Sequence, residues 1–256
     1  MKNRFRLMFA ATLAAVLLAP AAAQEQAPLR VFIRSSQKTH GPGLHDYPAF
    51  LNDWKKLLSE RGAVVDGAQR FPTADELAKT DVMIIYASDG GIVSPEERAV
   101  LEPYLTRGGG LVTIHDGMCS NDASWFATIV GAAKQHGEIN FSAGRMKLHF
   151  VDQTHPITQG LSDFEINDEA FFLLRTAPEM HALATTALPS THAGEIVPQL
   201  WTYEKTLPGG QRYRSFVSMQ GHLYTNFTVP AYQNLLLRGI AWAGKRPVDL
   251  LTRSTH

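Results

Sequence analysis

Short apolar runs alternate with amphipathic stretches over the first half of the chain. Residues 29–35 and 82–86 are mostly apolar, which is typical of parallel strands that are covered on both faces. Between these runs, residues 47–60 carry large apolar side chains at helical spacing, so we predict a helix there. Further strands are expected at residues 63–65 and 111–115.

Two helix starts are marked by N-capping patterns. Glu76 follows Thr73 at the spacing of a capping box, which predicts a short helix. The run Ser94-Pro95-Glu96-Glu97 combines an N-cap, a proline at the first helical position and early acidic residues. The helix that begins there is expected to end at Arg107-Gly108.

Alternating strands and helices predict a parallel sheet with right-handed crossovers. The carboxyl ends of all its strands then lie at one edge, where such sheets bind ligands. The segments that follow strands at this edge are residues 36–46, 87–91 and 115–121. We therefore expect functional residues in these three segments.

The alternation stops after Phe126. Strand candidates then follow one another without a helix between each pair, which indicates an elaborated or partly antiparallel second half. A final amphipathic helix at residues 230–242 is expected to pack on the sheet. No repeat or low-complexity linker divides residues 24–256, so a single domain is predicted. The strand candidates are residues 146–151, 180–185, 199–203 and 213–219.

The first 23 residues have the pattern of a secretory signal. A basic start at residues 2–6 precedes an apolar core, residues 7–18, that is too short to span a bilayer comfortably. Three alanines at residues 21–23 offer small side chains for cleavage before Gln24. We expect a periplasmic or secreted protein without stable membrane insertion, and a retained anchor is the alternative.

Composition narrows the class of partner. Without the first 23 of its 256 residues the chain has 21 basic and 24 acidic residues, a net charge of −3, so nucleic acid is not an expected partner. Cys119 is the only cysteine, so an internal disulfide is excluded. With 45% apolar residues, the chain can build a core of one compact domain. A homo-oligomer is left open.

Histidines recur directly after predicted strands. The stretch KTHGPGLHDYP places His40 and His45 on either side of a Gly-Pro-Gly turn. His115 ends the strand GLVTIHDG, and Gly221-His222 follows another apolar strand. Imidazole is a good base or metal ligand. These positions predict a histidine group at the sheet edge, with a buried, hydrogen-bonded structural role as the alternative for His115.

Asp168 and Glu169 form an adjacent acidic pair in the most patterned stretch of the second half. In an extended segment neighbouring side chains face opposite ways, so only one of the two is expected to enter a given pocket. Neutral imidazoles together with a carboxylate form a plausible site for Zn²⁺ or a similar divalent metal. Because four histidines exceed what one metal needs, some are expected to serve as acid, base or hydrogen-bonding groups.

Four segments together resemble the ThuA-like (trehalose utilisation) family, in order over nearly the whole mature chain. Members of this family resemble class I glutamine amidotransferase domains without the amidotransferase nucleophile. The resemblance therefore implies an α/β fold, a flavodoxin-like three-layer sandwich with a mostly parallel sheet. The segments are THGPGLHDY, GGGLVTIHDG, HPITQGLSDFEINDEAFF and SMQGHLYTNFTVPAYQNLLLRGIAWAGK.

The resemblance also carries over positions. His115 occupies the elbow where amidotransferases place cysteine, and His222 falls near their catalytic histidine. His40 and His45 match the first-loop histidines of the family, and Asp168-Glu169 matches its acidic pair. Family members are associated with the catabolism of sugars, including trehalose and 3-keto sugars, so a small carbohydrate is the implied substrate.

Together these inferences predict an exported enzyme that acts on a glycoside, disaccharide or 3-keto-sugar by elimination, hydrolysis or isomerisation. His45, His222 and Glu169 are the expected metal ligands, with His40 as an alternative, and His115 is the expected general base or acid. The further expected catalytic groups are His222, Glu169 and Asp168, and the expected substrate-binding residues are His40, Tyr47, Trp125 and Tyr224.

Two other functions stay open. The first is a sugar-binding module without turnover. The second is a hydrolase or amidase that uses Cys119, which predicts inactivation by thiol alkylation. Cys119 lies four residues beyond the elbow, so a cysteine thioester mechanism and glutamine hydrolysis are not expected.

Overall fold

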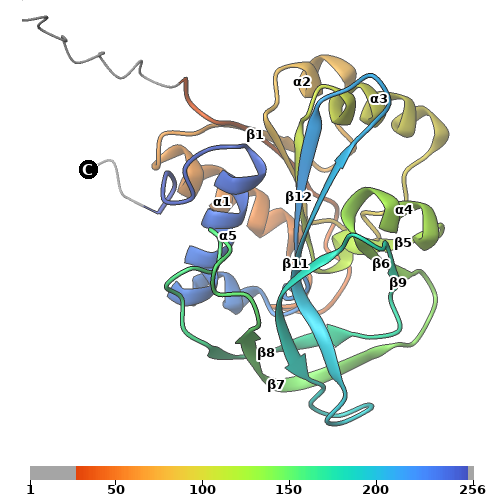
Figure 1. The fold of residues 1–256 in the computed structure, drawn as a ribbon, viewed down its shortest axis with the longest axis vertical. Coiled ribbons are helices and arrows are strands. Elements are labelled where there is room, and N and C mark those ends of the chain that lie inside the picture. Colours follow the sequence, from red (N-terminus) through yellow and green to blue (C-terminus); the bar gives the residue numbers. More distant parts are fainter. Residues whose placement is uncertain (1–26, 253–256) are drawn as a thin grey trace, which may run out of the picture.

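The computed structural model describes residues 27–252, so the predicted signal segment and its cleavage site lie outside the described residues. Figure 1 labels the elements along the chain. The first run is β1 (Arg30–Arg34), α1 (Tyr47–Ser59), β2 (Val64–Ala68), α2 (Ala74–Ala78), β3 (Val82–Ile85), α3 (Pro95–Thr106), β4 (Gly110–Ile114) and the 3-10 helix η1 (His115–Met118). The second run is β5 (Cys119–Ser120), α4 (Ala123–Val130), β6 (Ala132–Gln135), β7 (Phe141–Phe150), β8 (Phe164–Phe171), β9 (Arg175–Thr176), β10 (His181–Ala187), β11 (Ile196–Thr206), β12 (Arg212–Ser218), η2 (Tyr224–Thr228) and α5 (Pro230–Ala243).

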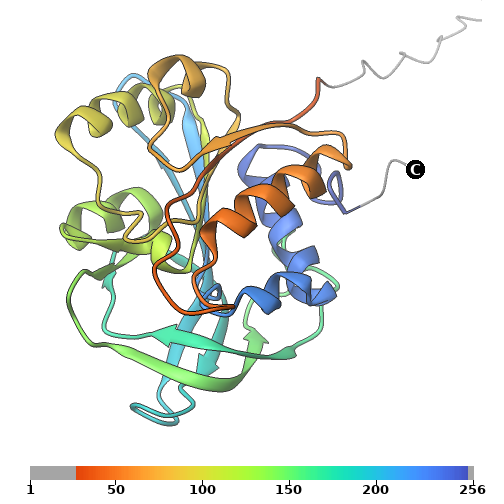
Figure 2. The same cartoon turned by 180° about the vertical axis from the view of Figure 1, so that it is seen from behind.

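A nine-stranded sheet of order β2-β1-β3-β4-β12-β11-β10-β7-β8 runs through the centre. Its first five strands are parallel, which confirms the arrangement expected from the first half of the sequence. Figures 1 and 2 show α1 and α5 on one face of this part of the sheet, and α3 and α4 on the other. The protein therefore has the predicted flavodoxin-like sandwich fold.

Local sequence signals explain where two helices begin. The hydroxyls of Thr73 and Ser94 accept hydrogen bonds from the backbone N–H groups of Glu76 and Glu97, at 3.3 and 3.2 Å. The two glutamate carboxylates accept in return from the backbone N–H groups of Thr73 and Ser94, at 2.7 and 2.9 Å. Both capping boxes thus satisfy N–H groups that a helix start leaves without partners.

The second half is antiparallel from β12 to β8, as its pattern indicates. The edge strand β8 is not among the predicted strands, because it carries the acidic pair and lacks a regular alternation of apolar residues. A separate three-stranded sheet, β5-β6-β9, is not predicted by the sequence pattern either.

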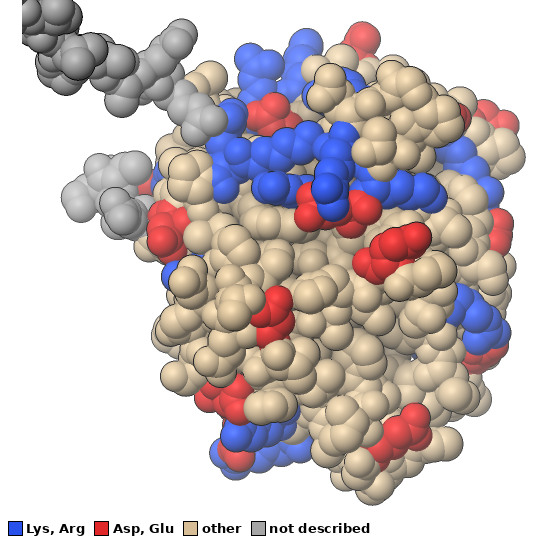
Figure 3. Space-filling model, in the orientation of Figure 1, with Lys and Arg blue, Asp and Glu red and all other residues tan. Residues whose placement is uncertain are grey.

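Apolar residues of the central strands and of α5 form one core that extends across both halves of the sheet. No helix within residues 27–252 is long and apolar enough to cross a membrane. On the face that Figure 3 presents, lysine and arginine side chains gather in a band along the upper part, and most of the middle is uncharged.

Candidate metal and active site

Four predicted residues, His45, His115, Glu169 and His222, converge at the carboxyl edge of the sheet. Nε2 of His45 lies 2.9 Å from Nε2 of His115 and 2.8 Å from Nδ1 of His222. One carboxylate oxygen of Glu169 lies 3.4 Å from Nδ1 of His222 and 3.8 Å from Nε2 of His115. All four ligand atoms lie within 4.8 Å of one another, so these residues could hold one metal ion; we call them the His–Glu group.

Unusual backbone conformations aim two of these side chains. His45 has φ 43° and His115 has φ 49°, in the left-handed region that residues other than glycine rarely adopt. His115 was expected to end a strand, but it begins the turn η1 directly after β4. Such conformations cost free energy and cluster at functional sites.

Gly221 lets the third histidine approach the other two. Its φ is 151°, and a Cβ atom built on it would lie 2.8 Å from Cβ of His115. The hydroxyl of Tyr86 donates a hydrogen bond to the Gly221 carbonyl, and the backbone N–H of His45 donates to the His222 carbonyl at 3.0 Å. Only glycine fits this close approach of two backbone segments without displacement.

Hydrogen bonds outside the His–Glu group fix which ring nitrogens face inward. Nδ1 of His115 lies 2.8 Å from the Met219 carbonyl, and because a carbonyl only accepts, Nδ1 carries the hydrogen. The lone pair of Nε2 therefore points into the group. Nδ1 of His45 lies 3.4 Å from the carboxylate of Asp116, which also accepts from the Tyr47 hydroxyl at 3.0 Å. Metal-bound histidines have outer partners of these kinds.

Burial keeps the imidazoles neutral. It lowers the pKa of His45 and of His115 to about 3, and it lowers the pKa of His222 as well. At neutral pH each neutral ring carries one hydrogen, so with the hydrogen of His45 on Nδ1 toward Asp116 its Nε2 offers a lone pair to the group. Neutral imidazoles with one carboxylate match the donor set that Zn²⁺ accepts, so the residues fit such an ion.

Glu169 and Asp168 leave β8 in different directions, as an extended strand requires. Glu169 faces the histidines, and burial raises the pKa of its carboxyl to about 7, with the charge of Asp168 adding to this effect. Asp168 instead accepts hydrogen bonds from the backbone N–H groups of Gly221 and His222, both at 3.0 Å, and from the side chain of Asn226. Burial also raises its pKa, to about 7. Asp168 thus holds the backbone that presents His222.

His40 lies at the exposed side of the His–Glu group. Its ring centroid is 4.0 Å from that of His45 and 5.7 Å from that of His222. Nδ1 of His40 forms a 2.9 Å hydrogen bond with the Thr39 hydroxyl. His40 is therefore close enough to meet a ligand that enters beside the group, but it is not one of the four converging residues.

The aromatic residues expected to contact a sugar are dispersed. Among them only Tyr47 approaches the histidines, with its ring centroid 5.5 Å from that of His45. Tyr47 is completely buried, so neither face of its ring is free to stack on a sugar. The expected contact of Tyr47 with a sugar does not fit the structure. Trp125 lines a different pocket, and the guanidinium carbon of Arg98 covers its ring at 3.6 Å. Tyr224 is half-buried, and its hydroxyl donates to the carboxylate of Asp53.

Cys119 is placed where it makes a poor nucleophile. Only 3% of its surface is accessible, and its thiol donates to the Asp116 carboxylate at 3.5 Å. Burial and the nearby carboxylate raise the pKa of the thiol, so little thiolate is present at neutral pH. These observations disfavour the alternative of a Cys119-dependent hydrolase.

Sequence reasoning missed Asp116 and Asn226. Asp116 directly follows His115, and that position in the elbow segment was the one signal that could have found it. Asn226 lies in η2, and its side chain donates a hydrogen bond to the buried Asp168 carboxylate. No local sequence pattern predicts this contact. Both residues support the ligands and lie outside the group itself.

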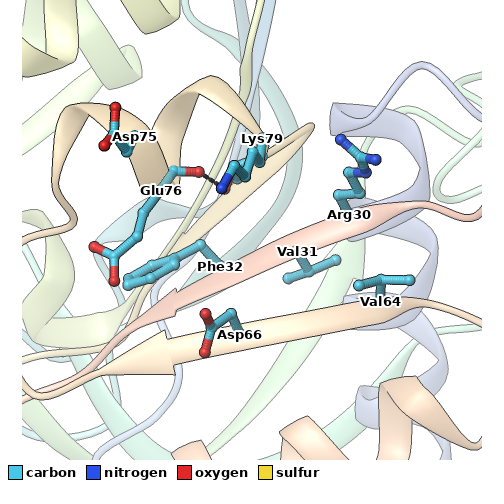
Figure 4. A pocket seen from close by; sticks show the side chains of 9 residues that line it. Arg30, Val31, Phe32, Val64, Asp66, Asp75, Glu76 and Lys79 are labelled. Carbon is cyan, nitrogen blue, oxygen red and sulfur yellow. Dashed lines mark hydrogen bonds between the residues drawn. The ribbon is translucent and has the colours of Figure 1, made fainter.

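A cavity elsewhere in the protein shares no residue with this site. It has a volume of about 340 Å³ and lies between β1, β2 and α2, near the amino ends of the strands (Figure 4). Its lining includes the apolar residues Val31, Phe32 and Val64 and the charged residues Asp66 and Lys79. The His–Glu group lies at the opposite, carboxyl ends of the parallel strands.

The fold and the His–Glu group together define a flavodoxin-like α/β protein with a candidate metal site at the carboxyl edge of its sheet. The family model ThuA, described as trehalose utilisation, matches residues 32–243. The chain therefore belongs to the ThuA family. No curated protein sequence matches it.

Solved structures share the fold. A ThuA-like protein from Bacteroides uniformis ATCC 8492 aligns with a TM-score of 0.67 and 18% identity over 88% of this chain and 95% of that one. Another, from Parabacteroides merdae ATCC 43184, gives 0.62 and 19% over 90% and 92%. The β-galactosidase of Rahnella sp. R3 gives 0.50 and 15% over 86% of this chain and 32% of its own. At these identities the likeness concerns the fold alone.

Proposed function

We propose that this protein is an exported, metal-dependent enzyme that acts on a glycoside, a disaccharide or a 3-keto-sugar derivative. The N-terminal signal pattern supports export, and membership of the ThuA family supports a carbohydrate substrate. The observation that carries the proposal is the convergence of three neutral imidazoles and one carboxylate within 4.8 Å.

In this proposal the three histidines hold the metal. His115 has no accessible surface, and its Nδ1 is committed to the Met219 carbonyl, so neither nitrogen is free to exchange a proton with a substrate. This geometry favours His115 as a ligand over its expected role as general base. His45 and His222 supply the other two nitrogens, at 2.8 Å from each other.

Glu169 is then the group that carries a proton. Its side chain is 15% exposed, and burial raises its pKa to about 7 in the metal-free protein. A bound divalent cation would favour the carboxylate form, which is the form that a base needs. With a 3-keto-glycoside, the Glu169 carboxylate would take the proton from the carbon beside the carbonyl. The electron pair of that bond would form a carbon–carbon double bond as the glycosidic C–O bond breaks, and water would protonate the departing oxygen. A bound divalent cation would polarise the carbonyl and so acidify that C–H bond.

The test separates ligands from the base. Purified mature protein should contain one equivalent of divalent metal by mass spectrometry, and His45→Ala, His115→Ala and His222→Ala should each reduce this content at least tenfold. Glu169→Gln should keep most of the metal but lose turnover of 3-keto-glucosides. His149→Ala is the matched control, because His149 is an exposed histidine that pairs with Asp163 at 2.8 Å.

Three results would contradict the proposal. Unchanged metal content in the three histidine variants would exclude the metal arrangement. Full turnover by Glu169→Gln would exclude Glu169 as base. Binding of glucosides and 3-keto-glucosides without any product would favour the sugar-binding module instead.

A further inference from the structure

Lys134 is a buried cation beside the His–Glu group. It lies on β6, and only 9% of its surface is accessible. Its Nζ donates one hydrogen bond, to the Glu138 carbonyl at 2.8 Å. Among residues 27–252 no carboxylate forms an ion pair with it. An ammonium group has three N–H donors, so two of them have no protein acceptor in the described part of the chain.

This burial is unusual for a lysine. Lysine is almost never fully buried unless it is paired, because an isolated charge loses its hydration. The four-carbon stem is long enough in general to bring the ammonium to water, but only 9% of the surface of Lys134 is accessible. Lys205 shows the ordinary case, with its Nζ donating to the Thr128 carbonyl at 3.1 Å in an exposed hydrogen bond.

Lys134 lies close to the His–Glu group in the fold. In the pairing of β5 with β6, Lys134 stands opposite Cys119, four residues after the elbow residue His115. Its Nζ lies 5.3 Å from the ring centroid of Phe171, and another neighbour of that ring is His115, stacked at 4.9 Å. The Phe171 ring thus contacts both the ammonium and a member of the His–Glu group.

The electrostatic influence of Lys134 extends to two members of the His–Glu group. Its positive charge acts on the Glu169 side chain and on the His115 ring. The carboxylates of Asp168 and Asp116 also act on the Glu169 carboxyl. Lys134 therefore shares one electrostatic environment with the site.

We propose that Lys134 forms an oxyanion subsite next to the His–Glu group, where its two free N–H donors bind a substrate oxygen that carries or gains negative charge. Hydrogen bonds from an ammonium to an oxyanion are charge-assisted and about twice as strong as neutral ones. Donors that are fixed before the reaction stabilise charge that develops in it. That the bound oxygen belongs to a sugar rests on the proposed function.

Inorganic phosphate is a probe that does not depend on sugar chemistry. Calorimetric titration of the protein as purified, with its metal content measured, should show phosphate binding in the millimolar range or tighter. Lys134→Gln should weaken this affinity at least tenfold, and Lys134→Arg should stay within about threefold of wild type. Lys205→Gln is the control and should leave phosphate binding unchanged. Thermal unfolding and metal analysis verify that the Lys134→Gln protein is folded and loaded as wild type.

Two results would overturn the inference. One is that wild type shows no phosphate binding at about 10 mM, a concentration that would nearly saturate a site of millimolar affinity. The other is that folded Lys134→Gln binds phosphate as tightly as wild type. Two sugars then distinguish the source of the charge. If methyl glucuronide binds at least tenfold more tightly than methyl glucoside only when Lys134 is present, the substrate carries a carboxylate. If Lys134-dependent phosphate binding persists without this preference, the charge develops during the reaction.

Failure of the proposed function would look different. If the metal arrangement is wrong, the histidine variants will keep their metal content. If the sugar chemistry is wrong, the 3-keto-glucoside assay will show no product. Phosphate binding that depends on Lys134 would stand in either case.

Discussion

Substituting Gly221 by alanine should damage the site and lower stability together. An added Cβ atom would lie 2.8 Å from Cβ of His115 and 3.0 Å from Cγ2 of Ile114, both closer than ordinary contacts. Neither neighbour can yield easily, because Ile114 belongs to the central strand β4 and the His115 ring is bound to the Met219 carbonyl. The backbone must therefore shift, and it carries His222 with it.

The size of the effect follows from two contributions. A backbone conformation that L-residues rarely adopt costs about 1–3 kcal/mol, and φ is 151° at Gly221. Overpacking of a filled interior costs about 1–3 kcal/mol more. We expect a loss of roughly 2–6 kcal/mol in the free energy of unfolding. For a domain of this size that corresponds to a fall in Tm of at least about 4 °C.

Two glycines of one loop provide matched controls. Gly43 has φ 76°, but no atom lies within 4 Å of the place that a Cβ atom would take, so Gly43→Ala tests backbone strain alone. Gly41 has neither the positive φ nor a close neighbour, so Gly41→Ala should change stability by less than about 0.5 kcal/mol. Urea unfolding of the three variants, with metal analysis, gives the order expected: Gly221→Ala most affected, then Gly43→Ala, then Gly41→Ala. If Gly221→Ala unfolds like Gly41→Ala and keeps its metal, the close packing against His115 is refuted.

Three further changes have defined outcomes. In the metal-free protein the pKa of folded His45 is about 3, below its ordinary value of 6.5, so unfolding takes up a proton at acidic pH. The free energy of unfolding should therefore fall as pH drops from about 6.5 towards 3. In urea titrations His45→Asn should show a smaller fall, and an equal fall would contradict the buried neutral imidazole. Asp168→Asn should lower the free energy of unfolding in urea by roughly 2–4 kcal/mol. The reason is that the NH₂ group of the new asparagine must face N–H donors, either those of the Gly221–His222 backbone or those of the other partners of Asp168. A change below about 0.5 kcal/mol would argue against this hydrogen-bond pattern. The buried thiol of Cys119, with its raised pKa, should react with iodoacetamide at pH 8 at least tenfold more slowly in native than in urea-unfolded protein, and rapid native labelling would count against the burial.

The parallel half of the fold could be predicted because its signals are local. Strands such as β3 are covered on both faces and are therefore continuously apolar, and the capping residues Thr73 and Ser94 mark helix starts by side-chain chemistry alone. β8 escaped prediction because the residues that serve the site, Asp168 and Glu169, interrupt its apolar pattern.

The candidate site was predictable in its members but not in their arrangement. The histidines stood out because each follows a strand, and topology brings such positions to one edge. That Glu169 faces inward while Asp168 holds a backbone depends on the register of β8 against β7, which pairs Ala143 with Glu169. Lys134 gave no signal, because a lysine in a short strand looks like a surface residue until its burial is known.

The ligand segments of the His–Glu group are far apart along the chain. His45 and His222 are separated by 177 positions, and η1 and β8 contribute His115 and Glu169 between them. Contacts of such long sequence separation form slowly, since the loops that join them must be closed first. The complete His–Glu group therefore exists only after the loop before α1, the turn η1, the edge strand β8 and the segment after β12 have all assembled. Metal uptake by this protein should thus be a late event that marks finished folding, and a chain stopped before residue 222 would lack a ligand however well its first half had folded.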